Sequence, residues 1–355
     1  MLLRVPDYYD KFHCLAGACP HTCCAGWEVV IDPETAAEYC NVSGPLGDRL
    51  RRSLTRREGE LCFSLEEGRC PFLQPDGLCR VYRELGEEHL SRTCRAHPRF
   101  TEEFGALRET SLAASCPAVT ELLLGSGAPL TFPQTETEEP AAPWTDEWVP
   151  PLLECRERAF ELLRDRSRPL RERAAWFLLF CNDAQVLLDE SRPEDLTALC
   201  ADWADVPETL EPELSAGRGI FPHALRVLEG LEHLDGDWNG LLRQAERSHA
   251  VRCTESAGER ILCYFVFRHF LKAVTDGDLL SRAELAVFCL LVVERLSGVC
   301  GLEEALRRCC RELEHSPENL AALQAAFCGD LELGLGNFFS ELLGRQADTK
   351  GTFTR

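Results

Sequence analysis

The spacing of apolar residues along the chain changes near residue 150. From residue 152 to 345, apolar residues recur at intervals of three and four, as in LRERAAWFLLFCNDAQVLLDE and RAELAVFCLLVVERLSG. This is the period of α-helices that each bury one face. Pro193 and Pro317 stand where new helices are expected to begin. The pattern predicts an all-helical domain over 152–345, followed by a flexible tail at 346–355.

The first 125 residues follow a different pattern, with short apolar runs separated by Pro, Gly and polar turn residues. A short strand is expected at 27–31, just before a helix start at Pro33. Short helices are expected at 33–40, 45–57, 80–90 and 116–124. Residues 126–151 are rich in Pro, Thr, Glu and Ala, which is typical of a linker or a strap across the surface. We therefore expect a mainly α fold, with a cysteine-rich domain at 1–125 that has little regular sheet.

Charge and hydropathy exclude some functions. The net charge of −21 makes binding to nucleic acid improbable, because phosphate backbones are repelled. The same charge either attracts a cationic protein partner or serves only solubility. No run of about 18 apolar residues is present, so no membrane span is expected. The start of the chain carries Arg4, Asp7, Asp10 and Lys11 where a signal peptide needs apolar residues, which indicates a cytoplasmic protein.

Twenty cysteines are the outlying feature of the composition, and ten of them precede residue 120. In a reducing compartment, clustered cysteines indicate metal or redox sites rather than disulfides. Later cysteines such as Cys181 and Cys289 lie in apolar helical segments, where we expect them to be buried in packing. Cys40, in the helix-like segment ETAAEYC, is also expected to pack. The other early cysteines stand among turn residues, which would let the chain wrap thiolates around a metal.

The early cysteines are arranged as Cys14-x4-Cys19-x3-Cys23-Cys24, then Cys70-x8-Cys79-x14-Cys94, then Cys116. Thiolates bind soft metals strongly, and four of them complete a tetrahedral zinc site or a cubane cluster. The spacing matches neither ferredoxins nor zinc ribbons, so it does not choose between zinc and iron–sulfur. Adjacent cysteines cannot easily chelate one metal with both sulfurs. One of the pair Cys23–Cys24 would then pack, or the two would face different metals.

Two further segments contain candidate functional side chains. His97, three residues after Cys94, could bind metal, although a hydrogen bond to a ligand is favoured. Tyr264 and Arg268 share one face of the apolar segment CYFVFRHFLKAV. A buried arginine can clamp the carboxylate of a ligand. The favoured alternative is an internal ion pair, with Asp276 or Glu259 as the partner.

The runs FHCLAGACPHTCCAGWEVVID, RCPFLQPDGLCRVYRELGEEHLSRTCRAHPRF and SLAASCP resemble the flagellin lysine-N-methylase family, as does the later YFVFRHFLKAVTDGDL. The first 120 residues also resemble the broader CxxxCC-type zinc- or iron-chelating domain. The closer resemblance implies S-adenosylmethionine-dependent methylation of flagellin lysines by a bacterial enzyme with a [4Fe-4S] cluster. It places the family's cysteines on Cys14, Cys19, Cys23, Cys24, Cys62, Cys70, Cys79, Cys94 and Cys116. Nine exceed what one cubane needs, so some are structural or there are two metal sites.

Methyl transfer to lysine requires a neutral amine, which a dry pocket favours, and an aromatic wall can stabilise the cation. Trp27, Tyr82 and Tyr264 are candidates for such a wall. The residues themselves identify no pocket for the methyl donor. Two hypotheses therefore remain: a protein-lysine methyltransferase that carries a metal cluster, or a non-enzymatic iron–sulfur or zinc protein with a redox or metal-handling role.

Overall fold

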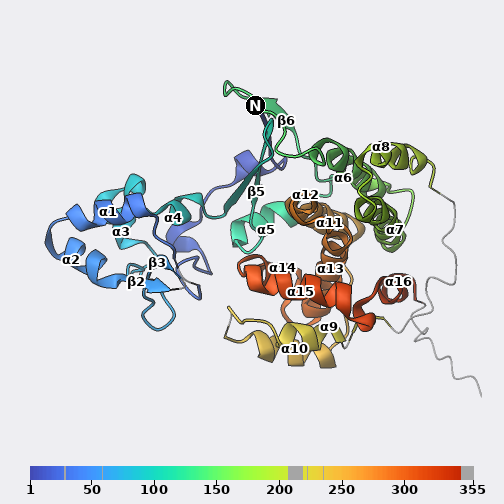
Figure 1. Ribbon diagram of the computed structural model, residues 1–355. Helices are drawn as coiled ribbons and strands as arrows, with labels where there is room; N and C mark the ends of the chain where they lie inside the picture. Colours follow the sequence, from blue (N-terminus) through green and yellow to red (C-terminus); the bar gives the residue numbers. More distant parts are fainter. Residues whose placement is uncertain (28, 58, 207–218, 222, 235, 345–355) are drawn as a thin grey trace, which may run out of the picture.

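A computed structural model describes residues 1–27, 29–57, 59–206, 219–221, 223–234 and 236–344. The described chain is mostly helical, which confirms the prediction of a mainly α fold. It contains two hydrophobic cores: a small one within the N-terminal lobe and a large one among the later helices. Figure 1 shows the N-terminal lobe, with α1, α2 and α3, at one side of the helices α6 to α16. The predicted tail at 346–355 lies outside the described residues.

The small lobe is built from short elements around one core. Its elements are α1 (Pro33–Asn41), α2 (Gly44–Ser53), β2 (Leu54–Arg57), β3 (Glu60–Phe63), α3 (Arg80–Leu85) and α4 (Arg92–Ala96). Asp32 caps α1 by accepting a hydrogen bond from the Thr35 N–H, and Pro33 occupies the first turn. The core side chains are Val29, Ile31, Tyr39, Leu46, Leu50, Phe63, Cys70, Phe72 and Val81. Because these residues come from helices, strands and turns alike, the lobe depends on tertiary packing rather than on any long element.

The helices expected in the first 125 residues are present, with shorter bounds in two cases. The segment expected at 45–57 turns into strand β2 after Ser53, and the segment expected at 80–90 ends as a helix at Leu85. The strand expected at 27–31 does not form among the described residues of that segment, so this prediction is wrong for them. Val30 makes only an isolated bridge with Cys62.

A four-stranded sheet connects the N-terminus to the helices. Its strands are β1 (Leu2–Arg4), β4 (Arg99–Glu103), β5 (Leu107–Leu112) and β6 (Gln134–Glu136), in the order β4-β5-β1-β6. β1 runs parallel to β5, with Leu2 opposite Leu107, and the other neighbours are antiparallel. Leu130 and Phe132, within the segment expected to be a linker, are buried in the large core. The chain from β4 to β6 therefore packs with the later helices.

The large core is formed by helices that surround α13 (Leu280–Cys300). The other helices are α5 (Pro117–Leu124), α6 (Val149–Arg164), α7 (Leu170–Asp189), α8 (Pro193–Asp202), α9 (His223–Glu229), α10 (Trp238–Arg247), α11 (Glu255–His269), α12 (Ala273–Asp276), α14 (Leu302–Glu314), α15 (Pro317–Gly329) and α16 (Leu335–Leu343). Short 3-10 turns lie at Tyr9–Lys11, Ala16–Ala18, Glu87–His89, Phe270–Lys272 and Leu331–Leu333. α13 is buried along nearly its whole length because it is apolar on all sides. No helix among the described residues is long and apolar enough to span a membrane.

Candidate functional site

Four of the predicted cysteines gather around the core of the small lobe. Cys70 is buried, and Cys24, Cys79 and Cys94 pack against the same core. The Cys70 N–H donates to the Cys24 carbonyl at 2.8 Å. Burial, with smaller contributions from charge on the other three thiols, raises the pKa of Cys70 to about 12, although a hydrogen bond from the backbone of Phe72 acts against the rise. Burial also raises the pKa of Cys94 to about 11, with Cys24 and Cys79 contributing. The four thiols therefore lie within electrostatic range of one another, and we call them the core thiols.

Cys14, Cys19 and Cys116 form a second set of cysteines, which lie within electrostatic range of one another at Cys116. Cys116 stands at the N-cap of α5, and burial raises the pKa of its thiol, with contributions from charge on Cys19 and Cys14. Cys23 donates a hydrogen bond to Cys24, which raises the pKa of Cys23 and lowers that of Cys24 to about 7. Cys23 also lies within electrostatic range of Cys14. Cys23 is thus close to Cys24 and within electrostatic range of Cys94 and Cys14, and whether the adjacent pair faces one metal or two stays a prediction.

The remaining cysteines are placed differently. Cys62 is buried within β3, opposite Thr55 of β2. Cys181 and Cys289 are fully buried in the large core, as predicted. Cys40 is exposed, so the expectation that it packs is wrong.

The core thiols are of the kind that binds metals preferring sulfur, and all four belong to one small core or pack against it. Within the part of the chain that the structure describes, however, no three or more His, Cys, Asp or Glu side chains are arranged so that they could hold a metal ion. The structure thus places these four predicted ligands at one core, but their sulfur atoms are not arranged around a common metal position. Which of the nine cysteines bind metal stays a prediction.

Where the small lobe meets the helices, three aromatic rings contact one another. The ring centroids are 5.8 Å apart for Trp27 and His97, 5.4 Å for Trp27 and His315, and 5.9 Å for His97 and His315. We call these three rings the junction triad. All three side chains are half-buried, and the ring of Phe100 in β4 also contacts His315, with centroids 5.8 Å apart. Ser115 Oγ lies 2.7 Å from His315 Nε2. The triad thus combines two imidazoles and an indole at a partly open boundary.

Two hydrogen bonds to backbone carbonyls hold the loop that carries Trp27. The indole Nε1 donates to the Cys23 carbonyl at 2.6 Å, within the segment that also contains Cys24. On the other side, Arg311 Nη2 of α14 donates to the Ala25 carbonyl at 2.7 Å. Gly26 lies between these contacts with φ +81°, where a Cβ atom would overlap the Arg311 guanidinium. The Arg311 side chain of α14 therefore packs directly against the backbone of this loop.

Behind the junction triad lies a buried ionic network centred on Glu314. Arg268 Nε donates to the Glu314 carboxylate, and Arg268 Nη1 donates to Ser111 Oγ at 2.7 Å. Tyr264 donates to Glu314 at 2.7 Å, and His269 Nε2 lies 3.0 Å from the same carboxylate. Burial alone would raise the pKa of Glu314, but Arg268, His269 and Tyr264 together lower it well below its usual range. Glu314 is therefore a carboxylate at neutral pH, fully paired inside the protein.

This network accounts for the predicted candidates on α11. Arg268 forms an internal ion pair, which was the favoured alternative, but its partner is Glu314. Asp276 and Glu259 are the wrong partners: Asp276 pairs with Arg282, and Glu259 pairs with Arg166 and Arg173. Tyr264 is 2% exposed, and its hydroxyl also accepts a hydrogen bond from the Ala114 N–H at 2.9 Å. Tyr82 is 53% exposed on α3. Of the three candidate aromatics, Trp27 is the one in the junction triad.

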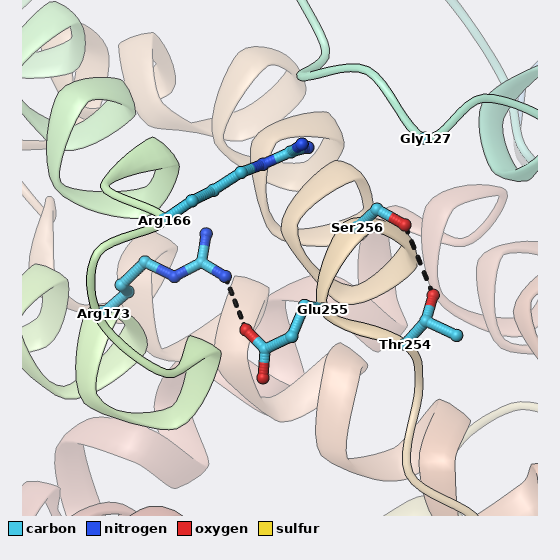
Figure 2. Close-up of a pocket in the computed structure, with 6 residues that line it drawn as sticks. All are labelled: Gly127, Arg166, Arg173, Thr254, Glu255 and Ser256. Carbon is cyan, nitrogen blue, oxygen red and sulfur yellow. Dashed lines mark hydrogen bonds and ion pairs between the residues drawn. The ribbon is translucent and has the colours of Figure 1, made fainter.

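A surface pocket lies at the opposite end of α11 (Figure 2). It has a volume of about 400 Å³ and is lined by Gly127, Arg166, Arg173, Thr254, Glu255 and Ser256. Arg173 donates to Glu255 at 2.7 Å and to Glu259 at 2.8 Å, and Arg166 donates to both oxygens of Glu259 at 2.8 Å. The two arginines are therefore engaged by carboxylates of the protein itself. Since α11 rises about 1.5 Å per residue, its 15 residues separate this pocket from Arg268 by roughly 20 Å.

The sequence did not single out three of the residues that the junction brings together. Glu314 is the last residue of α14 and His315 is its C-cap, whereas Ser115 lies 200 positions before His315 in the chain. Their pairing depends on the packing of α14 beside α5, which no local pattern encodes. One weak feature of the sequence points to His315: it directly precedes Ser316–Pro317, where a helix begins.

Among curated proteins, the chain is similar to a lysine-N-methylase of Salmonella typhimurium, with 32% identity over 126 residues that cover 34% of this chain and 31% of that protein. It is also similar to the flagellar biosynthetic protein FliU of Salmonella muenchen, with 32% identity over 126 residues that cover 34% of this chain and 75% of that protein. A lysine-N-methylase of Salmonella choleraesuis is 32% identical over 127 residues, 31% of its length. The match thus spans about a third of the two lysine-N-methylases. No protein-family model and no solved structure matches the chain.

Proposed function

The chain belongs to the flagellin lysine-N-methylase family, and from that premise we propose that it methylates lysine side chains of flagellin, with S-adenosylmethionine as the methyl donor. The observation that carries the proposal is the similarity to lysine-N-methylases and to FliU. The junction triad adds support, because it offers an aromatic face and two imidazoles at one partly open place. We also propose that the reaction takes place in the cytoplasm, where flagellar subunits are made.

We propose further that the core thiols, Cys24, Cys70, Cys79 and Cys94, hold an iron–sulfur cluster. Two observations support this proposal: the charges of the four thiols affect one another's pKa, and all four cysteines belong to one small core or pack against it. Bound there, the cluster would cross-link four segments of the small lobe and thereby hold the loop with Trp27 in place. The second set and Cys62 would then be structural, or part of the second set would hold a further metal.

The charge of the protein favours a basic substrate segment. The chain carries 59 acidic and 38 basic residues, so its field attracts the ammonium group of an exposed lysine. Such steering acts on the rate of encounter and weakens with salt, because the Debye length falls to about 10 Å at 0.1 M. We expect methylation at low substrate concentration to slow as ionic strength rises.

The activity can be tested by combining the protein, S-adenosylmethionine and flagellin without oxygen. Each transferred methyl group should add about 14 Da to the intact mass of flagellin. If the donor binds and flagellin stays unmodified, flagellin is not the substrate. If the donor does not bind at all, the non-enzymatic metal-binding role replaces the proposal.

The metal can be tested independently of activity. Protein purified without oxygen should be brown and should contain iron and acid-labile sulfide, because thiolate-to-iron charge transfer absorbs in the visible. Colourless protein with stoichiometric zinc and no sulfide would refute the iron–sulfur proposal.

A further inference from the structure

We propose that His315 is the general base of the reaction: its imidazole accepts the proton of the substrate lysine, whose ammonium group docks against the face of Trp27. This inference rests on the proposed function and assigns the atoms that would carry it out. It requires a basic nitrogen, a group that orients it, and an aromatic surface for the cation, all at one accessible place.

The geometry provides these three elements. His315 Nε2 lies 2.7 Å from Ser115 Oγ, which fixes the plane of the imidazole and leaves Nδ1 for the substrate. The Trp27 and His315 ring centroids are 5.4 Å apart, so a cation over the indole lies within reach of the imidazole. Both side chains are half-buried and keep part of their surface open to solvent. Other histidines lack this combination: His269, for example, is buried and paired with Glu314.

The surroundings of His315 keep it neutral and ready to accept a proton. Burial lowers the pKa of His315, the Glu314 carboxylate raises it, and the charges of Arg268 and Arg311 lower it again. The neighbouring His97 has its pKa lowered to about 4, mainly by burial, so it adds no positive charge at neutral pH. Among the described residues, Trp27, Phe100 and Ser115 also contact His315, and these three carry no charge. The Glu314 carboxylate, one residue away, would stabilise the imidazolium once it forms.

The lysine ammonium, with an ordinary pKa of about 10.4, passes one proton to His315 and becomes a neutral amine. The amine lone pair then forms a bond to the methyl carbon of the sulfonium donor as the carbon–sulfur bond breaks, and the donor leaves as a neutral thioether. The product is a methylated ammonium, and His315 returns its proton to water. His315 supplies only the proton transfer, so its loss should matter least at high pH, where more lysine is already neutral.

The test compares single-turnover methylation by the wild-type protein, His315→Asn and the control His89→Asn from pH 7 to 10, with donor at saturation. His89 is 40% exposed and pairs with Glu38 in the small lobe. We expect His315→Asn to lose about 100-fold in rate at pH 7 and to recover most of that loss by pH 10, while the control matches the wild type. A His315→Asn rate within about threefold of the wild type at every pH would overturn the inference while leaving the proposed function standing.

Two further measurements separate a chemical role from a structural one. If His315→Asn does not fold, as judged by circular dichroism, Ser115→Ala decides: it should lower the rate about 10-fold through the lost orienting hydrogen bond, with metal content unchanged. A Ser115→Ala rate equal to the wild type would count against the assignment. If the wild-type protein binds donor but methylates no lysine, both the proposed function and this inference fail.

Discussion

Gly26 is tightly constrained at the junction between the small lobe and α14. Its φ of +81° lies in the left-handed region, where an L residue costs about 1–2 kcal/mol. A Cβ atom there would also overlap Arg311 Nη2 and lie 2.9 Å from the Leu234 carbonyl oxygen. Arg311 would have to move and release the Ala25 carbonyl, a charged hydrogen bond worth about 1.5–3 kcal/mol. We expect Gly26→Ala to reduce the free energy of unfolding by about 3–5 kcal/mol.

Gly44 provides a matched control. Its φ is +77°, and a Cβ atom there would meet nothing within 4 Å. Gly44→Ala should therefore carry the conformational cost alone, about 1–2 kcal/mol. Urea unfolding followed by circular dichroism measures both variants against the wild type. Because Gly26→Ala also displaces the loop that carries Trp27, methylation should fall in that variant and persist in Gly44→Ala.

Equal losses of stability in the two alanine variants would refute this reasoning. They would mean that the loop at Gly26 tolerates a methyl group without moving, and that the contact with α14 is looser than the structure indicates. Normal methylation by a Gly26→Ala protein that is clearly destabilised would separate the junction from the reaction.

Three other substitutions test other parts of the account. Glu314→Gln leaves Arg268 charged and buried without its carboxylate, so urea unfolding should show that the free energy of unfolding falls by about 3–5 kcal/mol. The control Glu66→Gln removes one partner of an exposed ion pair and should cost at most about 1 kcal/mol. Similar losses in the two variants would contradict the buried network. Glu284 is buried in α13, and burial raises its pKa to about 8, so the folded state holds a proton that the unfolded state has lost. Wild-type stability should then fall between about pH 5 and 8, and that slope should flatten in Glu284→Gln; an unchanged slope would show that this group does not set it. Cys70→Ala should lower metal content while Cys181→Ala leaves it unchanged, as measured by iron and zinc analysis, and equal loss from both would show that the cysteines are divided wrongly.

The parts of the fold that local pattern determines could be predicted. The helices α7, α11 and α13 follow from apolar residues at helical spacing, and α1 follows from its capping residue and proline. The strand expected at 27–31 failed for a physical reason. A strand needs a continuous partner, and among the described residues Val30 forms a single isolated bridge, with Cys62.

The parts of the site that depend on tertiary contacts could not be predicted. A buried arginine at position 268 required an acidic partner, and the sequence near it offered Asp276 and Glu259. The actual partner, Glu314, is 46 residues away on α14. His315 escaped notice because its contacts, Trp27 and Ser115, come from the far end of the chain. The cysteines were identified by their number and spacing, but their division into core thiols and a second set required the folded lobe.

The most direct test of the central claim follows the methyl group itself. The protein, flagellin and S-adenosylmethionine with a deuterated methyl group would be combined without oxygen, and flagellin peptides would be sequenced by mass spectrometry. The account predicts lysine-containing peptides that are heavier by about 17 Da for each methyl group, and no such shift without the protein. Unlabelled lysines in every peptide, from protein that binds the donor and contains its metal, would contradict it.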